Sequence, residues 1–186
     1  MKIAIIGAGF SGIAIAWHLL NSSLSSAKIV IMDSKKIGYG TSGIATGLLH
    51  PYAGAHAKLN WRGVEGVEAT KKLLEVASDT LKLPVIAQNK GILRLALNDD
   101  QVLDFQRCAK SFHDVEWLDP GHCQQIVPGC ALAPGLWIKN GLMVYSSLYL
   151  KGLWKACEQL GAKFEQKTIH SLKETAEFDI TIVATG

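Results

Sequence analysis

Hydrophobic positions near the N-terminus form two short continuous runs with a helical pattern between them. Residues 2–6 (KIAII) and 28–33 (KIVIMD) are rich in β-branched side chains, which is typical of strands buried on both faces of a parallel sheet. Residues 13–20 (IAIAWHLL) form an apolar segment that predicts a buried helix. A strand, a turn, a helix and a second strand in this order are the βαβ unit of an α/β protein.

The pattern changes after this unit. Residues 61–83 carry apolar side chains near helical spacing, and Pro84 ends this predicted helix. Asn140-Gly141 predicts a hairpin turn. The other predicted elements are a strand at 91–97, a helix at 99–113 capped by Asp99 or Asp100, an extended piece at 116–119, a turn or short helix at Pro120, a serine-capped helix from 146 that ends before Gly161, and strands at 163–169 and 178–186.

These elements predict an α/β fold in which a dinucleotide-binding part is discontinuous in sequence. We expect a Rossmann-type domain, a parallel sheet with flanking helices, at residues 1–84 and 141–186. Residues 85–140 are expected to form an inserted α+β unit, because their short strands do not continue the βαβ series.

Composition restricts the class of protein. Hydrophobic residues make up 48% of the 186 residues and charged residues 19%, which indicates a globular chain. The net charge of +3 comes from scattered basic residues and does not indicate a nucleic-acid partner. Four cysteines lack CxxC or metal-ligand spacing, so we expect no metal and a reducing compartment. No stretch is apolar enough to span a membrane and glycines interrupt the N-terminal run, so we interpret the chain as cytoplasmic.

The sequence GAGFSG, directly after the first strand, has the spacing G-x-G-x-x-G. Gly7 allows a tight turn, Gly9 lets the backbone approach a pyrophosphate, and Gly12 lets the helix and the strand pack closely. The phosphates would bind at the helix N-terminus. Asp33 ends the second strand, 21 positions after Gly12, where an acidic side chain accepts hydrogen bonds from ribose hydroxyls. Its charge disfavours a 2′-phosphate.

The next stretch, GYGTSGIATGLLHPYAG at 38–54, combines many glycines and small residues with aromatic and histidine side chains. Here the sequence resembles the D-amino-acid-oxidase (DAO) superfamily of FAD-dependent oxidoreductases, which includes glycine oxidase and sarcosine oxidase. In that family a loop G-x-G-[AST]-S-x-x-x-x-G follows the acidic residue and lies over the flavin. The resemblance therefore implies FAD as the cofactor. An NAD-dependent dehydrogenase is the alternative that this loop disfavours.

The resemblance extends over nearly the whole chain. The segment 91–97 resembles the first strand of the family's substrate domain, and FDITIVATG at 178–186 resembles a buried strand whose end passes beside the cofactor. The cofactor-binding residues implied by the motif and the resemblance are Gly7, Ala8, Gly9, Phe10, Ser11, Gly12, Asp33, Ser34, Gly40, Thr41, Ser42, Ala45, Thr46, Gly47, Ala184, Thr185 and Gly186.

Candidate catalytic residues are fewer. The stretch LLHPYAGAHAKLNWRGVEG resembles family members with a His-Pro pair followed by W-[RK]-G, and loosely a tRNA-modifying relative. His50 is a candidate for handling protons or orienting substrate, or it hydrogen-bonds its own loop. Arg62 is a candidate carboxylate clamp beside Trp61, or it forms a surface ion pair where the helix begins. A tRNA partner follows from family analogy alone.

The resemblance implies an enzyme that oxidises a C–N bond of a small amine or amino acid, with hydride transfer to flavin N5. Family members continue for about as long again beyond Gly186, so we interpret the chain as the N-terminal part of a longer flavoprotein or a truncated product. A non-catalytic nucleotide-binding fragment is the alternative function. The sequence predicts neither the substrate, the electron acceptor nor the oligomeric state.

Overall fold

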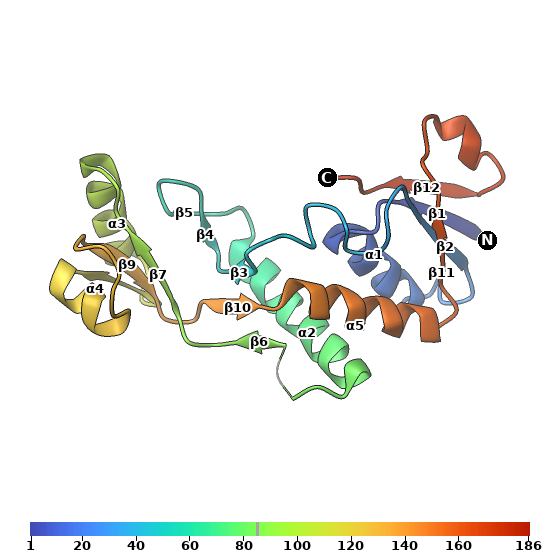
Figure 1. Cartoon of the computed structure of the whole chain (residues 1–186). Coiled ribbons are helices and arrows are strands. Elements are labelled where there is room, and N and C mark those ends of the chain that lie inside the picture. Colours follow the sequence, from blue (N-terminus) through green and yellow to red (C-terminus); the bar gives the residue numbers. More distant parts are fainter. Residues whose placement is uncertain (85) are drawn as a thin grey trace. The chain divides into compact units, whose positions relative to one another are not determined.

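The computed structural model describes residues 1–84 and 86–186, which divide into two compact units. The first unit comprises Met1–Thr46, Lys71–Ile86 and Tyr145–Gly186, and the second comprises Gly47–Thr70 and Ala87–Val144. Figure 1 labels their elements. None of the described helices combines the length and apolarity that a membrane crossing needs.

A four-stranded parallel sheet forms the centre of the first unit. Its order is β11-β2-β1-β12. Ile5 lies opposite both Ile31 and Ile182, and the side chains of Ile5 and Ile31 are fully buried. The β-branched runs therefore form the interior strands, and the predicted α/β fold with a parallel sheet is confirmed. The bounds are β1 (Lys2–Ile6), β2 (Lys28–Asp33), β11 (Lys163–Gln166) and β12 (Ile180–Val183).

Helices α1 (Phe10–Leu20) and α5 (Ser146–Gln159) pack against each other and cover one face of this sheet (Figure 1). Trp154 of α5 meets Phe164 of β11 edge-on, with ring centroids 6.1 Å apart. Ile13 and Leu153 are buried in this layer. The apolar positions of the two helices thus form the core together with the isoleucines of the strands.

A crossover segment, residues 167–179, connects β11 at one edge of the sheet to β12 at the other. It contains one short 3₁₀ helix, η1 (Leu172–Thr175). The hydroxyl of Thr181 on β12 donates to that of Thr175 at 2.9 Å. Because Thr181 is aligned with Ala4, and side chains alternate along a strand, this contact lies on the face opposite Ile5.

The second unit is built on an antiparallel sheet of order β7-β9-β8, against which α3 packs. Its core contains Tyr52, Phe105, Leu136 and Ile138. The elements are β3 (Leu48–Leu49), β4 (Tyr52–Ala53), β5 (Lys58–Leu59), β6 (Ala87–Gln88), β7 (Ile92–Leu95), α3 (Asp99–Ser111), β8 (Val115–Leu118), α4 (Pro120–Ile126), β9 (Gly135–Ile138) and β10 (Leu142–Val144). Helix α2 (Gly63–Leu81) contributes its first turns to this unit and its remainder to the first.

Residues 47–70 group with the second unit, whereas the sequence assigns them to the dinucleotide-binding part. The reason is non-local pairing. Leu49 of β3 pairs with Leu142 of β10, and Tyr52 is buried beside Phe105 in the core of the second unit.

Three local predictions are wrong. Helix α3 is capped by Asn98, whose side chain accepts a hydrogen bond from the Gln101 amide at 2.9 Å, and Asp99 and Asp100 lie in its first turn. Helix α5 has no serine cap, because Tyr145 occupies the capping position. The turn at Asn140-Gly141 does not close a hairpin, because β9 and β10 belong to different sheets.

Gly152 provides a test of the packing in the first unit. A Cβ at Gly152 would lie 2.5 Å from the Ala77 carbonyl oxygen on α2, so Gly152→Ala should destabilise the fold by about 1–3 kcal/mol. Gly66 is the matched control, because it lies in a helix with open space around it. Gly66→Ala should be neutral or stabilising through helix propensity. Urea unfolding measures both, and equal stability of the two variants would contradict this packing.

Candidate functional site

The glycine turn after β1 is shaped by close backbone contacts. Gly7 has a φ of +115°, and a Cβ there would lie 2.4 Å from the Ala184 carbonyl oxygen that follows β12. A Cβ at Gly12 would lie 1.9 Å from the Gly7 carbonyl oxygen. Neither position can hold a side chain. The structure thus gives a physical reason for the first and third glycines of the motif.

The N-terminus of α1 is open to an anion. Its capping residue is Gly9, which has no side chain, and the first turn contains no acidic residue. The Phe10 amide donates to the Ser42 hydroxyl at 3.3 Å, and a Cβ at Gly9 would lie 2.8 Å from that oxygen. The ring of Phe10 stacks on Tyr149 of α5, with centroids 5.5 Å apart. The helix end therefore presents amides and a hydroxyl, the groups that bind phosphate oxygens.

Asp33 connects the end of β2 to the glycine turn. Its Oδ2 accepts a hydrogen bond from the Ala8 amide at 2.8 Å, and its Oδ1 accepts one from the Lys35 amide at 2.9 Å. The Ser34 hydroxyl also donates to Oδ1, at 3.5 Å. A carboxylate offers about four acceptor positions, so Asp33 keeps capacity for a further donor such as a ribose hydroxyl.

A cavity of about 210 Å³ lies beside Asp33. It is at the carboxyl ends of the strands, where open α/β sheets bind their ligands. Its lining is Ile6, Gly7, Met32, Asp33, Ser34, Lys167, Thr168, Ile169 and Thr185.

Sequence reasoning missed the three residues of this lining that follow β11, Lys167, Thr168 and Ile169. The sequence analysis placed all three inside the predicted strand at 163–169, whereas β11 ends at Gln166 and leaves them at the carboxyl edge of the sheet, where ligands bind.

The loop at residues 38–46 is held to the first unit from both sides. The Gly38 amide donates to the Ala8 carbonyl at 3.4 Å, and the Ser146 hydroxyl of α5 donates to the Ala45 carbonyl at 3.3 Å. Gly43, a residue outside the predicted set, is also required here, because a Cβ would lie 1.6 Å from the Gly38 carbonyl oxygen. The loop is therefore a defined structure built from small residues.

The predicted cofactor residues consequently separate into two groups. The first group belongs to the first unit. It consists of the residues of the glycine turn, Asp33 and Ser34, the loop residues up to Thr46, and the three residues that follow β12. Gly47 belongs to the second unit; its φ is +73° and its carbonyl accepts a hydrogen bond from Val144 at 2.7 Å. His50 and Arg62 also belong to the second unit.

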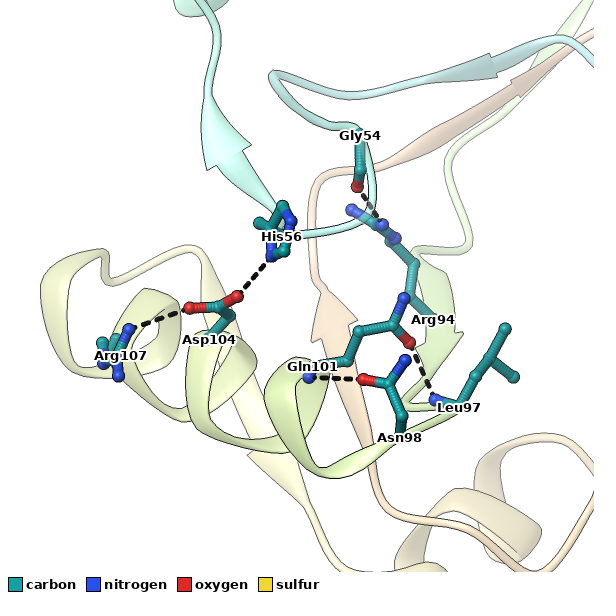
Figure 2. A network of polar contacts seen from close by, with 8 residues as sticks. All are labelled: Gly54, His56, Arg94, Leu97, Asn98, Gln101, Asp104 and Arg107. Carbon is teal, nitrogen blue, oxygen red and sulfur yellow. Dashed lines mark hydrogen bonds and ion pairs between the residues drawn. The ribbon is translucent and has the colours of Figure 1, made fainter.

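His50 lies in a loop that Arg94 of β7 holds in place. The guanidinium donates to the Tyr52 carbonyl at 2.6 Å. It also donates to the Gly54 carbonyl at 2.5 Å, as Figure 2 shows. In the next loop, between β4 and β5, His56 pairs with Asp104 of α3 at 2.5 Å (Figure 2). The Tyr52 amide donates to Nδ1 of His50 at 3.2 Å, so His50 does hydrogen-bond its own loop.

Arg62 is largely exposed immediately before α2 begins. Its Nε lies 3.4 Å from Glu65, and its guanidinium lies over the Trp61 ring at 5.8 Å. Its φ is +50°, an uncommon conformation for a residue other than glycine. The surface ion pair considered from sequence is thus present, while a role in binding substrate stays a prediction.

The FAD dependent oxidoreductase (DAO) family model matches residues 2–186. The chain belongs to this family. FAD is the cofactor of its members, which decides against the NAD-dependent alternative. No curated protein matches the sequence.

Solved structures with the same fold include several oxidases and a dehydrogenase. Glycine oxidase from Bacillus cereus has 19% identity and a TM-score of 0.76, covering 100% of this chain and 55% of its own. Glycine oxidase from Geobacillus kaustophilus has 21% identity and a TM-score of 0.74, and the match covers 89% of this chain and 46% of the oxidase. L-proline dehydrogenase from P. horikoshii has 18% identity and a TM-score of 0.70, and the match covers 91% of this chain and 45% of the dehydrogenase. The chain spans about half the length of these proteins.

The environment of His50 gives a prediction for its protonation. Burial, and secondarily the charge of Arg94, lower the pKa of His50 from its ordinary value of 6.5. Because Nδ1 accepts the Tyr52 amide, we expect the neutral tautomer with the proton on Nε2 at pH 7. Protonation then favours the unfolded state, so stability should fall as the pH drops below 6.5 towards the folded-state pKa.

Nitrogen-15 NMR of the imidazole, assigned with a His50→Gln variant, measures the tautomer and the titration. A protonated Nδ1, or a pKa above 6.5, would contradict the geometry of this loop.

Proposed function

We propose that this chain provides the FAD-binding region and part of the substrate-binding region of a flavoenzyme that oxidises a C–N bond of a small amine or amino acid. The observation that carries the proposal is the glycine turn, packed on Ala184 and hydrogen-bonded to Asp33, in a chain that the DAO family model matches throughout. The solved neighbours include glycine oxidase, iminodiacetate oxidase and L-proline dehydrogenase, which supports a small amine or amino acid as the substrate here.

The residues present fit FAD at each position that they would hold. The open N-terminus of α1, from Gly9 to Gly12, would bind the pyrophosphate, and Asp33 would accept from the ribose hydroxyls. The cavity walled by residues 167–169 would hold the adenosine end. The small side chains of residues 40–47 and the backbone of 184–186 would allow close approach to the flavin. A Cβ at Gly40 would meet open space, which is consistent with a surface that a flat ring covers.

When bound, FAD would supply the hydride acceptor, at flavin N5, for a C–H bond next to nitrogen. The chain's own residues would bind and orient the substrate. With Nδ1 engaged by the Tyr52 amide, His50 can donate from Nε2, so we propose that it orients substrate rather than removes a proton. Arg62 would bind a substrate carboxylate by exchanging its partner Glu65. We also retain a cytoplasmic location as part of this proposal.

Asp33→Asn tests the cofactor site. The substitution removes a charged acceptor and places an amide group opposite the Ala8 or the Lys35 N–H. FAD and ADP affinity should each fall by about 1.5–3 kcal/mol, roughly 10-fold to 160-fold, measured by calorimetry.

Asp179→Asn is the matched control. Asp179 also accepts a backbone hydrogen bond, from Lys2 at 2.7 Å, but it lies at the amino ends of the strands. Its replacement should leave both affinities unchanged. Equal affinity in the two variants would show that Asp33 does not contact the nucleotide.

The oxidation itself can be tested in a flavoprotein that contains residues 1–186 together with the remainder of a full-length family member. Anaerobic mixing with glycine, sarcosine, proline and other small amines should bleach the visible flavin absorbance with at least one of them. Stable FAD binding without bleaching by any amine would support the alternative, a non-catalytic nucleotide-binding protein.

A further inference from the structure

Residues 167–169 form one wall of the cavity beside Asp33, here called the adenosine cavity, and hydrogen bonds hold both ends of this short segment. Lys167, Thr168 and Ile169 line the cavity at the start of the crossover between β11 and β12. The Lys167 amide donates to the Asp33 carbonyl at 2.8 Å, which attaches the beginning of the turn to β2. Thr168 is exposed and Ile169 half-buried, so packing contributes little to the position of this wall. Polar contacts must determine it.

Glu174 supplies those contacts. Its Oε1 accepts hydrogen bonds from the His170 amide at 2.9 Å and from the Ser171 amide at 3.0 Å. Its Oε2 lies 3.9 Å from the Lys167 ammonium. Glu174 thus contacts the residues on both sides of Thr168 and Ile169. Together with Ser171, whose hydroxyl accepts the Lys173 amide at 3.3 Å, it forms the capping box of η1.

The 3₁₀ helix that carries Glu174 is itself attached to the sheet. Thr175 is only 2% exposed, its hydroxyl donates to the Leu172 carbonyl at 2.9 Å, and it accepts from Thr181 on β12 at 2.9 Å. The carboxylate therefore projects from a fixed base. The pKa of Glu174 is lowered, first by the hydrogen bond from the His170 amide and further by the hydrogen bond from the Ser171 amide and the charge of Lys167. The carboxylate therefore stays ionised at neutral pH.

We propose that Glu174 is a positioning residue for nucleotide binding: it holds residues 167–169 as the wall of the cavity that receives the adenosine half of the dinucleotide. This inference rests on the proposed function, which places adenosine in that cavity. It assigns to Glu174 an effect on ligand affinity without direct contact with the ligand. Because the capping hydrogen bonds carry the effect, a side chain with an equivalent acceptor should replace it.

The test measures ADP affinity of the whole chain by calorimetry, with urea unfolding to establish that each variant is folded. Glu174→Ala removes both capping hydrogen bonds and should weaken ADP binding about fivefold to tenfold. Glu174→Gln keeps an acceptor oxygen at the third position of the capping box and should bind within about twofold of the unmodified chain.

Glu177→Ala is the matched control, because it removes the same charge from the same crossover. Glu177 is exposed, pairs with Lys2 at 3.4 Å and lies outside the lining of the adenosine cavity. Its replacement should leave ADP affinity unchanged. Should Glu174→Ala fail to fold, Ser171→Ala decides instead, because it removes the other half of the capping box and should weaken ADP in the same direction.

Unchanged ADP affinity in folded Glu174→Ala, or equal weakening in Glu177→Ala, would overturn the inference and leave the proposed function intact. An unmodified chain that binds FAD but not ADP would also overturn the inference, because the adenosine half would then not be bound in this cavity. An unmodified chain that binds neither ligand would overturn the proposed cofactor site itself.

Discussion

The contact between the glycine turn and the end of β12 is the constraint on which the first unit depends. At Gly7 the backbone has a φ of +115° and leaves no room for a Cβ beside the Ala184 carbonyl. At Gly12 a Cβ would overlap the Gly7 carbonyl, so α1 can begin directly above β1. These approaches require glycine for steric reasons. They determine where the positive end of α1 lies relative to the carboxyl ends of the strands.

Other groups at this edge are arranged around that contact. Asp33 accepts the Ala8 amide, so the second strand is tied to the same turn. Ser42 contacts the first amide of α1, which brings the loop 38–46 to the helix end. The crossover after β11 closes one side of the cavity, and Glu174 accepts hydrogen bonds from its His170 and Ser171 amides. Each of these groups is polar and partly exposed, whereas the core behind them is almost wholly aliphatic. A rigid apolar base thus supports an edge of hydrogen-bonding groups.

In the second unit, the half-buried guanidinium of Arg94 holds backbone carbonyls of the segment around Tyr52. Arg94 donates to the carbonyls of Tyr52 and Gly54 and lies over the Phe105 ring at 5.1 Å. Burial raises the pKa of Tyr52, whose hydroxyl donates to Asp114. The loop that bears His50 is therefore fixed by charge-assisted hydrogen bonds. In this arrangement Nδ1 of His50 accepts the Tyr52 amide and burial lowers the pKa of His50, features that residue type alone does not specify.

The sequence by itself determined the features that depend on local interactions. Buried β-branched runs and the glycine spacing identified β1, α1, β2 and the position of Asp33, because strand burial and turn sterics act within about 30 residues. The small-residue loop at 38–54 indicated the family, and the match over residues 2–186 confirmed it. The start of an element at Pro120, which the sequence left as a turn or short helix and which is α4, and the end of α5 before Gly161 followed from proline and glycine chemistry.

Only the tertiary structure decided features that depend on which distant segments meet. The turn at Asn140-Gly141 lies between strands of different sheets because β9 pairs with β7 and β8, whereas β10 pairs with β3 and β6. The same pairing draws residues 47–70 into the second unit. The cavity wall at 167–169 meets Asp33 because β11 pairs in parallel with β2, with Gln166 opposite Asp33, and no local pattern encodes that pairing of distant strands.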